Sequence, residues 1–122
     1  MTINETTARP GWYSIHSAPA ERDILADAMP LYVYINEGDM SGDRLPDEDL
    51  EDSRALAELF AHRLPTSALS SRDLVNVYGA LNLFLDAADD FEEVCPALTA
   101  SARALCSSMI EDIKDIVLAV ID

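Results

Sequence analysis

The segment SRDLVNVYGALNLFLDAA, residues 71–88, gives the strongest indication of the fold class, because its apolar residues follow one regular spacing. They recur every three or four positions, which places them in a single stripe along an α-helix. The stripe consists of Leu74, Val77, Tyr78, Leu81, Phe84, Leu85 and Ala88. Ser70 or Ser71 is a suitable N-cap for this helix. Gly79 lies beside the stripe, where glycine costs about 1 kcal/mol relative to alanine unless a neighbouring backbone packs closely.

A second long helix is predicted to start at Pro96 and to extend to Ile121. Its main apolar line consists of Leu98, Ala102, Leu105, Met109, Ile113, Ile116 and Val120. A second line, which widens the apolar face, consists of Cys106, Ile110, Val117 and Ile121. Packing of three helices buries one such line. The second line is therefore either covered by the N-terminal part of the chain or left for a second copy of the protein.

A third helix is predicted between Pro46 and Pro65. Proline suits the first helical position, and the acids of the first turn interact favourably with the helix dipole. The apolar stripe of this helix consists of Leu50, Leu56, Ala57, Phe60 and Leu64. The opposite face carries Asp47, Glu48, Glu51 and Glu58. The segment therefore predicts an amphipathic helix with a strongly acidic solvent side.

The first 17 residues contain a Pro-Gly pair and show no helical period, so they predict an irregular arm. We expect Trp12, Tyr13 and Ile15 to anchor this arm to the core. An exposed hook that binds a partner is the alternative, because Trp and Tyr are common interface anchors.

The residues after this arm predict one more helix and then a strand. Ser17, Pro19 and Glu21 are typical of a helix start, and Pro30 is expected to end the helix. Residues 31–35, LYVYI, are β-branched and aromatic, which predicts a short strand. Continuation of the preceding helix is the alternative, which the proline disfavours.

These elements predict a mainly α fold, a small bundle of about four helices with an irregular N-terminal arm and at most one short strand. The 122 residues, 49% of them hydrophobic, are enough to bury a core as a single domain, residues 1–122. Cys95 and Cys106 would lie too far apart along the last helix for a disulfide. Since no signal peptide or membrane-spanning run is visible either, we expect a cytoplasmic protein with free thiols.

Charge is the most informative feature of the composition. The chain holds 23 acidic and 8 basic residues, a net charge of −15, whereas small soluble domains carry about 2–8 charges. Residues 37–58 account for −7 and residues 86–93 for −5, so the acids are concentrated in two segments. Such a charge repels nucleic acid and anionic membranes and speeds the encounter with basic proteins.

No catalytic, cofactor or metal motif is visible in the sequence. It contains no Gly-rich phosphate loop, no His-x-x-x-His or Cys-x-x-Cys pair and no Gly-x-Ser-x-Gly elbow. The acids between Asp39 and Asp49 do not match the spacing of a calcium loop. His62 is expected to interact with the carbonyls at the end of its helix. We therefore predict that the protein is not an enzyme and uses no cofactor or metal.

Two hypotheses about the function are compatible with these features of the sequence. The first is a non-enzymatic binding protein that inhibits or masks a basic, nucleic-acid-handling protein, with rigid rows of acids standing in for phosphates. The residues predicted to bind this partner are Asp47, Glu48, Glu51, Asp52, Glu58, Asp86, Asp89, Asp90, Glu92 and Glu93. The alternative is a homodimeric structural or adaptor domain. It would associate through the second apolar line, Cys106, Ile110, Val117 and Ile121.

In size and charge, though in no motif, the chain resembles two groups of small acidic proteins. One is the group of phage-encoded proteins that mimic DNA, including some anti-CRISPR and antirestriction proteins. The other is the group of immunity proteins that neutralise basic nuclease toxins. This resemblance implies inhibition of a basic partner, and it transfers no individual residue.

Overall fold

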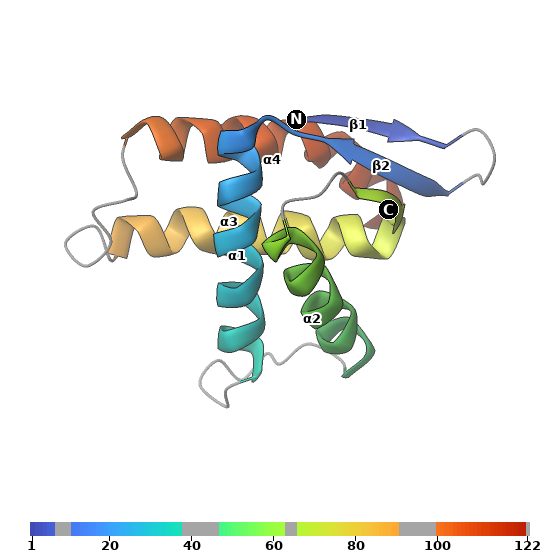
Figure 1. Ribbon diagram of the computed structural model, residues 1–122, viewed down its shortest axis with the longest axis horizontal. Helices are drawn as coiled ribbons and strands as arrows, with labels where there is room; N and C mark the ends of the chain where they lie inside the picture. The colour runs from blue at the N-terminus through green and yellow to red at the C-terminus, as the bar shows by residue number, and fades with distance from the viewer. Residues whose placement is uncertain (7–10, 38–46, 63–65, 91–99, 122) are drawn as a thin grey trace.

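The computed structural model (Figure 1) describes residues 1–6, 11–37, 47–62, 66–90 and 100–121. Its elements are, in order, β1 (Thr2–Glu5), β2 (Trp12–His16), α1 (Pro19–Glu37), α2 (Asp47–Ala61), β3 (Thr66–Ser70), α3 (Ser71–Asp90) and α4 (Ala100–Ile121). The predicted fold class is confirmed: the fold is mainly α, with four helices in the described part of the chain.

The four helices form two pairs that cross each other. In Figure 1, α3 and α4 lie alongside one another and run in opposite directions, while α1 crosses both at a steep angle. Helix α2 runs antiparallel beside α1, and both extend past α3 at their far ends. The small sheet lies at one end of α4, and the core is enclosed by the four helices and the sheet.

The N-terminal segment is a β-hairpin, so the prediction of an irregular arm is wrong. β1 pairs with β2 in antiparallel register, with Ile3 opposite Ile15. β3, which the sequence analysis did not predict, pairs with the other edge of β2. The expected anchoring is confirmed for Ile15, which is buried, and for Tyr13, which packs against the core. The hairpin was missed because each strand holds only four or five residues, too few to show a clear alternation.

α1 continues through Pro30, so the strand predicted for residues 31–35 is wrong. A proline inside a helix removes one backbone hydrogen bond and disturbs the preceding turn. Here its ring is exposed, whereas Ala28 and Met29 beside it are fully buried. Leu31 and Tyr32 then pack against the same core at helical spacing. Burial of this continuous face therefore outweighs the cost of the proline.

The predicted start of α1 is confirmed, and the N-terminus of the chain reinforces it. Pro19 is the first helical residue, and the Glu21 carboxylate accepts a hydrogen bond of 2.8 Å from the backbone N–H of Ala18. The amino group of Met1 also donates to Glu21 at 2.6 Å and lies 3.2 Å from Asp112 of α4. Glu21 and Asp112 thereby connect β1, α1 and α4 through one cation.

Where the structure describes them, the ends of the other helices agree with the ends predicted from the sequence. α2 begins immediately after Pro46 and ends at Ala61, so Leu64 and Pro65 lie outside the described residues. Ser70 caps α3, because its hydroxyl accepts from the N–H of Asp73 at 3.1 Å and its own N–H donates to the Asp73 carboxylate at 3.0 Å. The predicted start at Pro96 also lies outside the described residues.

Described residues from both apolar lines of α4 are buried within this one chain. Met109 and Ile113 of the main line are 0% exposed. Of the second line, Cys106, Ile110 and Val117 are 1%, 8% and 0% exposed and belong to the same core cluster. The open face that the homodimer hypothesis requires is therefore absent at these three positions, because α1, α3 and the sheet cover it. The side chain of Ile121 is not described.

Candidate functional site

The acids predicted on the solvent side of α2 are all exposed. Helix α2 buries Leu50, Ser53, Leu56 and Phe60 on one face. Because this face packs inward, the acids elsewhere on the helix point into solvent. They are Asp47, Glu48, Glu51, Asp52 and Glu58.

α1 contributes a second row of exposed residues, which was not predicted from the sequence. At intervals of four and three residues, its outer side carries Asp23, Asp27, Pro30, Tyr34 and Glu37, all of them exposed. Tyr34 is 76% exposed, the largest value among the large hydrophobic residues of the described chain. The same period would have revealed this row from the sequence if α1 had been continued through its proline.

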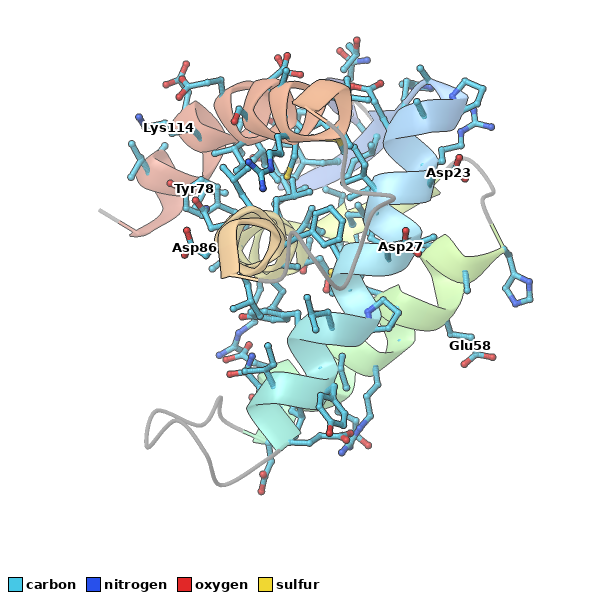
Figure 2. The ribbon with its side chains drawn as sticks, turned by 90° about the vertical axis from the view of Figure 1, so that its left-hand side faces the viewer. Asp23, Asp27, Glu58, Tyr78, Asp86 and Lys114 are labelled. Carbon is cyan, nitrogen blue, oxygen red and sulfur yellow. The ribbon has the colours of Figure 1, made fainter. Side chains whose placement is uncertain are left out.

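The two rows form one surface. Figure 2 shows Asp23 and Asp27 of α1 on the same side of the molecule as Glu58 of α2. Asp47 and Glu51 precede Glu58 by eleven and seven residues, which places them along the same line of α2. We call this surface the acidic face. It consists of Asp23, Asp27, Asp47, Glu51 and Glu58.

Two arginines form ion pairs with acids that are not members of the acidic face. Arg54 of α2 reaches across to Glu37 at the end of α1, with its Nε and one terminal nitrogen each 2.7 Å from the same carboxylate oxygen. Arg72 of α3 lies 2.8 Å from Asp49 and 3.4 Å from Glu48. Both arginines are more than half exposed.

Three of the five members of the acidic face are not neutralised by an ion pair with another residue that the structure describes. Asp23 and Asp47 each make a further interaction. By contrast, Asp27, Glu51 and Glu58 form no ion pair with any other residue that the structure describes. Three exposed carboxylates on two packed helices therefore remain available to an external cation.

The second predicted patch lies elsewhere. Asp86 of α3 is exposed, and Figure 2 shows it on the opposite side of the ribbon from Glu58. Asp89 and Asp90 belong to the last turn of α3, but their side chains are not described, and Glu92 and Glu93 lie outside the described residues. The described acids of the two segments are thus not brought together.

A serine and a histidine lie near each other on the sheet in the described part of the chain. The Ser14 hydroxyl and His16 Nε2 are 3.5 Å apart on the exposed side of the sheet, and the same hydroxyl lies 3.5 Å from the carbonyl oxygen of Asn4. These separations are too long for strong hydrogen bonds. Within the described ranges no three His, Cys, Asp or Glu residues are placed to hold a metal ion.

The comparisons with known proteins give no family. No protein-family model, no curated protein and no solved structure matches the chain significantly. None of the described helices combines the length and the apolar character needed to cross a bilayer.

Proposed function

We propose that this protein binds a basic, nucleic-acid-handling protein through the acidic face and thereby masks the surface on which that partner holds nucleic acid. The observation that carries this proposal is the set of exposed carboxylates of Asp27, Glu51 and Glu58, which have no ion-pair partner among the described residues. They belong to a chain with a net charge of −15.

The physical basis is the same as for nucleic acid itself. Carboxylates four residues apart on a helix are separated by about 6 Å along its axis, so two adjacent helices present a dense array of fixed negative charge. Lysines and arginines that dock on such an array release their counterions, and long-range attraction speeds the encounter. The exposed ring of Tyr34 in the α1 row offers a surface on which an arginine can stack.

Capture from an extract of the native host tests this proposal. The baits are the wild-type chain, an acidic-face variant (D27K/E51K/E58K) and a control variant (D86K/E111K/D115K). All six replaced acids are exposed, and each variant changes the net charge from −15 to −9. A basic nucleic-acid-binding protein retained by the wild type and the control, but lost by the acidic-face variant, supports the proposal. Equal retention by all three baits contradicts it.

The captured partner then allows a second measurement. The logarithm of its association constant should fall linearly with the logarithm of the salt concentration. We expect a smaller slope for the acidic-face variant than for the control variant. If the slope decreases by the same amount in both variants relative to the wild type, binding depends on the total charge of the protein and not on the acidic face. Displacement of a labelled DNA or RNA from the partner would test masking directly.

A further inference from the structure

The far ends of α1 and α2 stand apart from the main hydrophobic core. Figures 1 and 2 show both helices extending beyond α3. The core cluster and the residues packed on it include α1 as far as Tyr32 and α2 from Leu56 onward, but none of residues 33–37 or 47–55. Leu50 is buried, yet it is not a member of that cluster. We call residues 33–37 of α1 and 47–55 of α2 the distal part of the hairpin.

Ser53 in the distal part and Asn76 of α3, next to Tyr32, carry buried polar groups. The hydroxyl of Ser53 and the side-chain nitrogen of Asn76 are buried and have no hydrogen-bond partner within the described structure. The Tyr32 hydroxyl lies 3.5 Å from Asn76 Oδ1, too far for a strong bond. Burial, with the negative charge of Asp49 as a second cause, raises the pKa of Tyr32. A buried polar atom without a partner costs free energy, so this junction is weaker than an apolar one.

Two exposed arginines also form ion pairs with the distal part. Arg54 pairs with Glu37, and Arg72 pairs with Glu48 and Asp49. Both arginine side chains are more than half exposed, that of Asp49 is 16% exposed, and Asp47 makes a further interaction. Exposed pairs of this kind contribute little to stability. A short helical segment is also only marginally stable by itself in water. Among the described side chains, Leu50 is therefore the one large apolar residue that the distal part buries fully.

We propose that the distal part opens as a separate unit while the sheet, α3, α4 and the core-facing half of α1 stay folded. Segments with few buried apolar contacts and exposed polar contacts are the ones that open below the free energy of global unfolding. Opening moves Asp47 and Glu51 away from Asp23 and Asp27. The acidic face is therefore complete only in the closed form. The proposal does not depend on what this surface binds.

Native-state hydrogen exchange of the full chain, followed by NMR, tests the proposal. We expect the amides of Asn36 and Ser53 to exchange at least about 100-fold faster than those of Val77 and Ile113. Ile113→Val, which destabilises the core, should speed exchange at Val77 and Ile113 by about 3–10-fold and leave Asn36 and Ser53 unchanged. Equal protection of all four amides, lowered together by Ile113→Val, would overturn the proposal, because it would show one cooperative unit.

A second variant tests the role of the polar junction. Ser53→Ala removes the buried hydroxyl, so it should slow exchange at Asn36 and Ser53 by about tenfold and leave Val77 and Ile113 unchanged. Ser108→Ala, at an exposed position of α4, controls for the higher helix propensity of alanine. Faster exchange of the distal amides in Ser53→Ala than in the wild type would overturn the polar-junction argument, because the hydroxyl would then be stabilising.

Discussion

The aromatic ring of Tyr32 in α1 lies directly against the backbone of Gly79 in α3. A Cβ atom placed on Gly79 would be 3.1 Å from both Cε1 and the hydroxyl oxygen of Tyr32. The sequence suggested that Gly79 allows a close approach by a neighbouring backbone, but the neighbour is a side chain. The missing side chain of Gly79 therefore makes room for the Tyr32 ring between α1 and α3.

A double-mutant cycle measures this contact. Gly79→Ala should lower the free energy of unfolding of the wild type by about 1 kcal/mol, because the ring must shift. In a Tyr32→Leu background the clash is relieved, and the same change should stabilise by up to about 1 kcal/mol through helix propensity. Urea denaturation provides the four free energies. The same effect of Gly79→Ala in both backgrounds would show that the two residues are not coupled.

Pro30 provides a test of the continuous α1 helix. Pro30→Ala restores an N–H that can donate to the carbonyl of Ala26 and removes the clash of the ring, so we expect stabilisation by about 1–2 kcal/mol. Pro19→Ala is the matched control: proline suits the first helical position, and this change should bring no gain. Urea denaturation checks both variants. Destabilisation by Pro30→Ala would contradict a helix that continues through this residue.

The ion pair between Met1 and Glu21 predicts a pH dependence of stability. Burial, the largest contribution, raises the pKa of Glu21, but the hydrogen bonds from Met1 and Ala18 and the positive charge of Met1 together lower it below 4.5. The hydrogen bond to Glu21 is the main cause that raises the pKa of the Met1 amino group above 8.0, although burial opposes it. The ion pair therefore contributes its full stabilisation between about pH 4.5 and pH 8.0, where both groups are charged in the folded and the unfolded chain. Its contribution is lost as the pH falls through the lowered pKa of Glu21 or rises through the raised pKa of the amino group.

Glu21→Gln should accordingly lower the free energy of unfolding by about 1–3 kcal/mol at pH 6.5. The difference from the wild type should narrow at alkaline pH, as the pH rises through the raised pKa of the amino group and this group loses its charge. Asp115→Asn, which neutralises an exposed acid of α4, should change little at either pH. A constant difference between wild type and Glu21→Gln across this pH range would show that the ion pair is not the cause.

The thiol of Cys106 should be unreactive in the folded protein. Burial raises its pKa to about 11, and its S–H group donates to the carbonyl of Leu81 at 3.4 Å. The thiolate is the reactive form. We therefore expect alkylation of Cys106 by iodoacetamide at pH 8 to be at least about 100-fold slower in the folded than in the urea-unfolded chain. Mass spectrometry of the peptide that contains Cys106 gives both rates, and similar rates would contradict its burial.

The sequence predicted α2, α3 and α4 because helical periodicity is a local property. Residues such as Leu74, Val77 and Leu81 lie on one face in any α-helix, whatever packs against it. The acidic side of α2 was predictable for the same reason, since Glu51 and Glu58 lie opposite its apolar stripe. Asp23 and Asp27 were missed as part of that surface, because their place beside Glu58 depends on how α1 packs against α2.

The sheet, the continuous α1 helix and the shared acidic surface depend on contacts between residues far apart in the chain, so they could not be predicted from local sequence. The strands β1 and β2 are too short to be recognised alone, and they exist because β3 extends their sheet and the core covers Ile15. Burial of Ala28 and Met29 against other elements outweighs the local preference of Pro30 for a helix end. The sequence by itself thus determined which faces are apolar and where the charge is concentrated. Only long-range packing determined which apolar faces meet and which acids share a surface.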